Sequence, residues 1–195
     1  MSDSIIPSCS SGPYCVNLPY PASNKVQRQN TYYASILAED YAGPGSEMTA
    51  TNSYMYHHFI TTTCNEDVSC ILARIAICEM THLTMLGKLI CALGSSPKFQ
   101  TYGDNKSISW SAENLNYECS IKDILTSSIK GEQAAIKQYK EHIKQINDPY
   151  VQAVIARILL DEELHLATLT YYHDKYGKEK YLAPQKGFEL FLKPF

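Results

Sequence analysis

Two Glu-x-x-His pairs constrain this chain more than any other feature of its sequence. Glu79 precedes His82 and Glu162 precedes His165, and both pairs lie within long stretches of helical periodicity. Residues three apart on an α-helix share one face, so each pair directs a carboxylate and an imidazole toward one point. Two such pairs, joined by one glutamate from each of two further helices, form the ligand set of a di-iron or di-manganese site in a bundle core.

Apolar residues spaced alternately by four and three predict helices over about residues 31–62, 67–93, 119–146 and 150–174. On the buried side of the last three helices, Glu79, Glu132 and Glu162 stand where apolar residues are expected. Residues 1–30 and 175–195 lack this spacing, so we expect an extended N-terminal arm and a C-terminal tail around a helical domain over 31–174.

The first of these helices carries a break. Glu47 follows the same spacing, but Gly43-Pro44-Gly45 interrupts it. Proline removes an amide donor and clashes with the preceding turn, so the sequence predicts a kink or break near Tyr41. If the helix restarts at Gly45, Glu47 lies in its first turn.

The connections between the helices favour one topology. The first two helices are joined by about five residues around Cys64–Glu66, and the last two by Asn147-Asp148-Pro149, so each pair is antiparallel. Roughly two dozen residues separate Gly94 from Glu118, and a loop this long suits a crossover along the whole bundle. A single long crossover is typical of the ferritin-like arrangement of four helices.

The four glutamates stand at matching depths in this bundle. Glu47 and Glu79 lie about fifteen and thirteen residues from the first tight turn, and Glu132 and Glu162 lie at the same separations from the second. At 1.5 Å per residue, all four carboxylates fall at roughly 20–22 Å along the axis. Four buried glutamates in one layer would repel one another when ionised, whereas two divalent cations cancel that charge. The sequence therefore predicts that Glu47, Glu79, His82, Glu132, Glu162 and His165 hold a pair of metal ions.

Composition narrows the class of protein further. A net charge of −3 argues against a nucleic-acid partner, and we expect neither a membrane span nor a secretory signal. The seven cysteines form no CxxC pair, which argues against a rubredoxin-type or zinc-ribbon site. We interpret Cys64, Cys70, Cys78, Cys91 and Cys119 as small buried apolar residues, and Cys9 and Cys15 as candidates for crosslinks between subunits.

Several segments resemble one known family. They are Tyr41-Ala42-Gly43, Ser46-Glu47-Met48-Thr49-Ala50, the run from Ile75 to His82, and Glu162-Glu163-Leu164-His165. In these segments the chain resembles the ferritin-like superfamily, and within it the manganese-catalase branch that includes spore-coat proteins. The similarity spans roughly residues 18–175, and Pro44 is an insertion in the usual pattern beside Glu47.

This resemblance implies a metal centre that disproportionates hydrogen peroxide to water and oxygen. It implies that Glu47, Glu79, His82, Glu132 and His165 are ligands of two manganese ions, and that Glu162 is a further ligand or a carboxylate that handles protons. Oxygen and imidazole donors suit iron equally, so an iron ferroxidase or rubrerythrin-like peroxidase stays open. A third interpretation is a structural spore-coat component with a vestigial site. We expect a homo-oligomer, with other coat proteins as possible partners, in the cytoplasm or the spore coat.

Several other polar and aromatic side chains are weaker candidates for the metal site. Tyr54 and Tyr139 stand two turns from Glu47 and Glu132 on their own helices, where core packing is favoured over contact with a ligand. His57, His58 and His142 are predicted to lie outside the metal site, the first two at a helix surface or interface. Glu163 points away from the buried side and is expected to face solvent.

Overall fold

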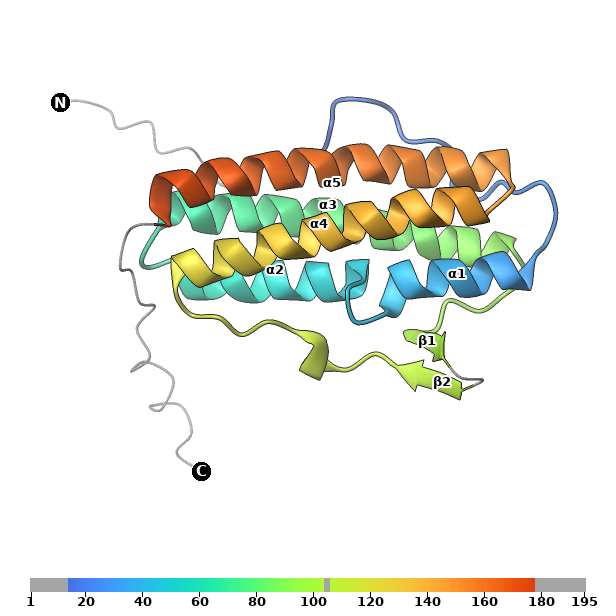
Figure 1. Cartoon of the computed structure of the whole chain (residues 1–195), viewed down its shortest axis with the longest axis horizontal. Helices are drawn as coiled ribbons and strands as arrows, with labels where there is room; N and C mark the ends of the chain where they lie inside the picture. The colour runs from blue at the N-terminus through green and yellow to red at the C-terminus, as the bar shows by residue number, and fades with distance from the viewer. Residues whose placement is uncertain (1–13, 104–105, 178–195) are drawn as a thin grey trace.

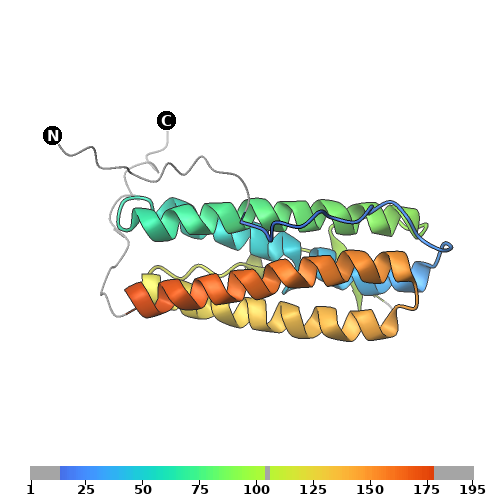
Figure 2. The same ribbon diagram turned by 90° about the horizontal axis from the view of Figure 1, so that it is seen from above.

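Long antiparallel rods form the body of the molecule (Figure 1). The computed structural model describes residues 14–103 and 106–177, and its helices are α1 (Thr31–Ala42), α2 (Glu47–Thr61), α3 (Glu66–Ala92), α4 (Ile121–Gln145) and α5 (Pro149–Tyr176). Helices α1 and α2 lie end to end and make one rod, so the five helices build a bundle of four rods, as Figure 2 also shows. The predicted all-α bundle is confirmed, and the predicted bounds differ from the observed ones by one or two residues.

Each helix begins at a polar residue whose side chain accepts hydrogen bonds from the first free backbone amides. These N-cap residues are Asn30, Ser46, Asn65, Ser120 and Asp148. Pro149 follows Asp148 at the first helical position, where proline lacks only an amide that would be unpaired anyway. The predicted stop and start at Asn147-Asp148-Pro149 is therefore confirmed.

The predicted break in the first rod is also confirmed. Helix α1 ends at Ala42, and α2 begins at Glu47, which occupies the first turn of the new helix. The Gly43 amide donates to the Glu39 carbonyl at 3.0 Å. A Cβ added at Gly43 would meet that carbonyl oxygen at 2.6 Å, so only glycine fits this close approach. The positive end of α2 consequently lies beside the Glu47 carboxylate.

The crossover between α3 and α4 packs against the first rod. It contains a hairpin of β1 (Gln100–Gly103) and β2 (Lys106–Ser109), paired antiparallel, followed by the short 3-10 helix η1 (Ala112–Asn114). Phe99 stacks on Tyr41 with ring centroids 5.4 Å apart, and the Trp110 indole donates to Thr49 Oγ1 at 2.9 Å. The long crossover was predicted from its length, but its hairpin was not.

The apolar core has two parts, one toward each end of the bundle. One contains Leu37, Leu86, Leu89 and Ile155, and the other contains Leu72, Ile75, Leu125 and Leu169. The buried glutamates and histidines of the Glu-x-x-His pairs lie between these two parts. Two apolar clusters therefore enclose one polar layer, and they stabilise the rods that carry it.

Helix α3 is long and rich in apolar residues. By length and hydropathy alone Glu66–Ala92 could cross a membrane, with a mean hydropathy of 1.4 over its most apolar window, of which 50% is buried. A helix in a protein core can meet the same measure, so the expectation of no membrane span is neither confirmed nor contradicted. The apolar character has a structural cause, because α3 lies against α1, α2 and α5 and supplies residues to both parts of the core.

Residues 14–30 run as an extended segment along the bundle before α1 begins (Figure 2). This agrees with the expected non-helical arm for the described part of residues 1–30. Residues 1–13, with Cys9, and most of the predicted tail lie outside the described residues.

Candidate metal centre

All six side chains predicted as ligands meet in the middle of the bundle. Each is at most 4% exposed, and their donor atoms form two groups within which all atoms lie within 4.8 Å of one another. One group consists of Glu47, Glu79, His82 and Glu162, and the other of Glu79, Glu132, Glu162 and His165. The four rods each contribute, as the matching depths predicted.

Two carboxylates belong to both groups. Glu79 places Oε2 at 2.9 Å from His82 Nδ1 and Oε1 at 3.1 Å from His165 Nδ1. Glu162 places Oε1 at 3.0 Å from His82 Nδ1 and Oε2 at 3.3 Å from His165 Nδ1. Each of these carboxylates therefore faces both imidazoles, and each would help to hold both cations if two were bound.

The outer partners of the imidazoles fix which ring nitrogen faces the centre. Nε2 of His165 donates to the backbone carbonyl of Tyr14 at 2.9 Å, and Nε2 of His82 donates to Asp161 Oδ2 at 3.0 Å. A carbonyl or an ionised carboxylate accepts only, so Nε2 carries the hydrogen in both rings. Nδ1 is then the nitrogen that takes a proton or a metal ion, and in both rings it points at the shared carboxylates.

Charge within the site is balanced between carboxylates and imidazoles. Burial, followed by the nearby Glu79 and Glu162, raises the pKa of Glu47 and of Glu132 well above its ordinary value. Burial acts upward on Glu79 too, but the two imidazoles outweigh it and lower the pKa of this carboxyl. Burial acts downward on both imidazoles, and the carboxylates around them outweigh it and raise the pKa of each well above its ordinary value. The cluster thus holds positive charge strongly.

The donor set fits two divalent cations. Glu79 Oε1, Glu162 Oε1 and His165 Nδ1 are buried and make no hydrogen bond, although each lies close to other donor atoms. Buried polar atoms without partners are costly, and ligation would satisfy all three. Two divalent ions also carry the charge that four carboxylates and two neutral imidazoles require. Oxygen and imidazole donors suit manganese and iron alike, so the donor types leave the metal open.

Two tyrosines reach across the bundle to the remaining glutamates. The Tyr54 hydroxyl on α2 donates to Glu132 Oε1 on α4, and the Tyr139 hydroxyl on α4 donates to Glu47 Oε1 on α2. Burial and the adjacent carboxylate raise the pKa of both phenols well above the ordinary value, so both stay protonated. Both tyrosines pack in the core as expected, and in addition each hydroxyl binds the ligand candidate on the opposite helix, not the one on its own.

A cavity of about 200 Å³ opens on the centre between α2 and α4. Glu47, Glu79, Glu132 and Glu162 line its inner end, and Asn116 of the crossover lines it as well. A space of this size admits several water-sized molecules. Small polar molecules can therefore reach the carboxylates from this side.

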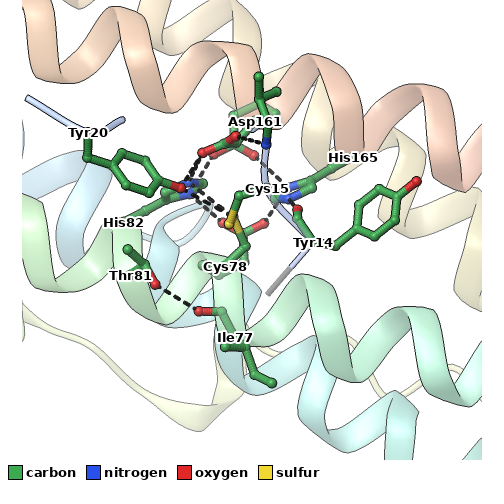
Figure 3. Close-up of a disulfide and its surroundings, with 12 residues drawn as sticks. Tyr14, Cys15, Tyr20, Ile77, Cys78, Thr81, His82, Asp161 and His165 are labelled. Atoms are coloured by element: carbon green, nitrogen blue, oxygen red, sulfur yellow. Dashed lines mark hydrogen bonds and ion pairs between the residues drawn. A yellow bond between two sulfur atoms is a disulfide. The ribbon is translucent and has the colours of Figure 1, made fainter. Parts of the chain in front are cut away.

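The opposite side of the centre, between α3 and α5, is covered by residues 14–20 (Figure 3). Cys15 forms a disulfide with Cys78, the residue before Glu79. The expected crosslink of Cys15 between subunits was therefore wrong, whereas Cys78 is buried as expected but bonded to Cys15. Proximity in space, which the spacing of cysteines does not reveal, decides this pairing.

The other cysteines also differ from the interpretation as buried apolar residues. Cys91 is exposed, and Cys64, Cys70 and Cys119 are half-buried. Within the described residues, Cys64, Cys91 and Cys119 form no disulfide.

Asp161 is the functional candidate that sequence reasoning missed. Besides His82, its carboxylate binds Arg157 at 2.7 Å, the Val16 amide at 2.7 Å and the Tyr20 hydroxyl at 2.5 Å. Burial acts upward, but these donors outweigh it and lower the pKa of Asp161 to about 2. The spacing of Arg157 and Asp161 by four in an otherwise apolar stretch was a signal that a buried ion pair lies there.

Three further histidines lie outside the six-residue centre, as predicted. His142 donates from Nδ1 to Asp40 at 2.8 Å, and Nδ1 of His58 lies 2.8 Å from Ser69 Oγ. His57 was expected at a surface or interface, but it is 1% exposed and lines the cavity, where burial lowers its pKa to about 4. Glu163 faces solvent as predicted and pairs with Lys140.

Comparison with known proteins gives the same class of fold and site. The model of the ferritin-like domain matches residues 45–178. A probable manganese catalase from Clostridium acetobutylicum is 26% identical over 161 residues, covering 73% of this chain and 71% of the relative. The crystal structure of KatB, a manganese catalase from Anabaena, superimposes with a TM-score of 0.74 at 26% identity, covering 83% of this chain and 80% of that one.

The bacterioferritin from Desulfovibrio desulfuricans, which has a diiron site, shares the fold at a TM-score of 0.60 and 22% identity, covering 75% of this chain and 82% of that one. A four-rod bundle with one long crossover and a buried layer of carboxylates and imidazoles defines a ferritin-like protein. The chain belongs to the ferritin-like family. Within that family its relatives, both in sequence and in structure, place it on the manganese-catalase-like branch.

Proposed function

We propose that this protein is a di-metal oxidoreductase that disproportionates hydrogen peroxide to water and oxygen, with two manganese ions as its cofactor. One observation supports this most strongly: two glutamates each face two imidazoles, so the donor atoms form two adjoining groups rather than one. Two adjoining ions that share ligands can exchange two electrons, which is the number that one peroxide gives or takes. The manganese catalase relatives support the choice of reaction and of metal.

The reaction needs protons to move together with electrons. One peroxide loses two electrons and two protons and becomes oxygen, and the other gains them, breaks its O–O bond and becomes two waters. The metal pair, when bound, would supply the two-electron exchange. Glu162 is the residue to which we assign proton transfer, because it faces both imidazoles and lines the cavity through which peroxide would enter.

The protein around the centre would keep the reaction confined. Tyr54 and Tyr139 hold Glu132 and Glu47 by hydrogen bonds from the cavity side. Residues 14–20 cover the opposite side, so we expect peroxide and water to enter through the cavity between α2 and α4. Glu47, Glu79, His82, Glu132, Glu162 and His165 are the residues that would hold the ions.

The test is oxygen release by protein of known metal content. We expect protein loaded with manganese to release one oxygen for every two molecules of peroxide consumed, with no electron donor present. Protein that takes up iron and consumes peroxide only with an added donor would overturn the proposal in favour of a peroxidase or ferroxidase. Protein that takes up neither metal would overturn it in favour of a structural component.

We further propose that the chain forms a homo-oligomer and works in the cytoplasm or the spore coat. This rests on the resemblance to manganese catalases and spore-coat proteins. Light scattering coupled to size-exclusion chromatography tests the first part, and we expect a mass above the 22.0 kDa of one chain. Immunogold labelling of spores would test the second.

A further inference from the structure

The segment of residues 14–20 contacts the outer side of both imidazoles, that of His165 directly and that of His82 through Asp161. Its Tyr14 carbonyl accepts from Nε2 of His165 at 2.9 Å. Its Val16 amide and Tyr20 hydroxyl donate to the two oxygens of Asp161, the carboxylate that in turn accepts from His82. In Figure 3 this segment passes between α3 and α5 directly over the two imidazoles.

His165 depends on this segment more than His82 does. The partner of His82 is the side chain of Asp161, which belongs to α5 and stays in the bundle wherever the segment goes. The partner of His165 is a backbone carbonyl of the segment itself. If the segment leaves, Nε2 of His165 loses its acceptor, and Asp161 loses two of its donors.

The disulfide fastens the segment at the point where these contacts are made. Cys15 lies between Tyr14 and Val16, and its partner Cys78 directly precedes Glu79, one of the two shared carboxylates. Cys78 Sγ is also 3.5 Å from Nε2 of His82 and 3.7 Å from the Tyr20 hydroxyl. The remaining contacts are noncovalent: Arg157 donates to the carbonyls of Val16 and Leu18, and the Tyr14 amide donates to the Arg74 carbonyl at 3.0 Å.

We propose that the Cys15–Cys78 disulfide is a redox-sensitive latch that holds residues 14–20 on the metal centre, so that its reduction loosens the hold on the metal ions. This inference rests on the proposed function, because it assumes that the six buried residues bind metal. Tyr14 and Asp161 act in it as positioning residues, since each fixes the orientation of one imidazole.

Both directions of the switch balance chemically. A reductant such as a phosphine gives two electrons to the S–S bond, takes up the oxygen of one water as the phosphine oxide, and leaves two thiols. Hydrogen peroxide reverses the change, because two thiols lose two protons and two electrons, the O–O bond breaks, and a disulfide and two waters form. Cys15 is half-buried and Cys78 is fully buried, so Cys15 is the sulfur that solutes would reach first.

The first experiment measures how fast manganese leaves the folded protein. Wild-type protein is reduced with tris(2-carboxyethyl)phosphine under inert gas, freed of the phosphine, loaded with manganese and challenged with a chelator. We expect release about 10–100-fold faster than from oxidised protein, because loss of an outer partner typically lowers metal affinity by that factor. Cys15→Ser should release as fast as reduced wild type, and reduction should not change it further.

Cys91→Ser is the matched control, since Cys91 is an exposed thiol on the same helix as Cys78. It should behave like wild type in both redox forms. Equal release from oxidised wild type, reduced wild type and Cys15→Ser would overturn the latch while leaving the proposed function intact. Oxidised protein that binds neither manganese nor iron would instead overturn the proposed function, and the link to metal retention with it.

A second measurement needs no metal. Hydrogen–deuterium exchange of the peptide that contains the Val16 amide reports whether the segment stays on Asp161. We expect exchange at least about tenfold faster after reduction, because the amide then depends on noncovalent contacts alone. Unchanged exchange would show that the segment is held without the disulfide and would overturn the latch directly.

Discussion

The two halves of the metal centre are nearly equivalent in their ligand candidates and quite different in what supports them. The half built from α2 and α3 supplies Glu47, Glu79 and His82, and the half built from α4 and α5 supplies Glu132 with a second Glu-x-x-His pair. Even the tyrosines are exchanged evenly, since each half donates one hydroxyl to a glutamate of the other. The inner shell therefore has an approximate twofold repeat.

The helices that carry the glutamates and the groups that orient the imidazoles do not follow this repeat. The rod that carries Glu47 is interrupted at Gly43, whereas α4 runs without a break from Ile121 to Gln145 past Glu132. His82 is oriented by a carboxylate within the bundle, whereas His165 is oriented by a backbone carbonyl of an extended segment. The two halves therefore repeat the same ligand types, whereas the groups that orient their imidazoles differ.

The largest expected effect comes from the two carboxylates that belong to both halves. Glu79→Gln and Glu162→Gln should each lose both metal ions and nearly all oxygen release, because either change removes a charge shared by both groups. The loss of affinity should exceed the roughly 10–100-fold that follows loss of an outer partner. Metal per chain, measured by plasma mass spectrometry, tests this.

Glu163→Gln provides the control, because it changes the neighbouring, half-exposed residue that pairs only with Lys140 at the surface. Retention of both ions in Glu162→Gln, together with loss of oxygen release, would break the equivalence of the halves. It would show that Glu162 handles protons while Glu79 alone joins the two groups.

An intermediate effect is expected at Asp161, which accepts a hydrogen bond from the imidazole of one half only, while the disulfide keeps residues 14–20 beside the other. Asp161→Asn keeps the size of the side chain but removes the charge that orients His82, so affinity for manganese should fall about 10–100-fold at that half alone. A titration that follows free Mn²⁺ by electron paramagnetic resonance should then resolve one strong and one weakened site. Two sites weakened equally would contradict separate control of the halves.

Asp40→Asn is the matched control for this change. Asp40 is also a buried carboxylate that accepts from a histidine, but its partner His142 lies outside the centre. Removing its charge should leave the two manganese affinities unchanged.

The sequence was sufficient to predict what repeats. The helical spacing of apolar residues predicted the four rods. The number of residues between each glutamate and its tight turn predicted that Glu47, Glu79, Glu132 and Glu162 meet at one level. Proline chemistry gave the break before Glu47. These features depend on local geometry within a helix or a turn, which a single sequence encodes directly.

The supports could not be predicted because they depend on contacts between distant segments. Cys15 and Cys78 are 63 residues apart, and the carbonyl of Tyr14 leaves no mark in the sequence, since every residue has one. Helical spacing places Tyr54 and Tyr139 near the glutamates of their own helices. In the structure their hydroxyls instead bind the glutamates of the opposite helices. Only the spacing of Arg157 and Asp161 by four residues indicated one of these contacts, a buried ion pair.

The smallest expected effect comes from the two tyrosine hydroxyls, the feature in which the halves are most alike. Tyr54→Phe and Tyr139→Phe each delete one buried hydroxyl that donates to a carboxylate, and the two tyrosines are 5% and 2% exposed. Each change should lower the free energy of unfolding of the metal-free protein by about 1–3 kcal/mol, because a buried acceptor is left without its donor. Tyr32→Phe, at an exposed position, should stay within about 0.5 kcal/mol of wild type.

Equal losses in denaturant unfolding would mean that the break at Gly43 does not weaken the contact made by Glu47. A clearly smaller loss for Tyr139→Phe would mean that the interrupted rod already holds Glu47 loosely, so that the twofold repeat fails in the inner shell as well as in its supports.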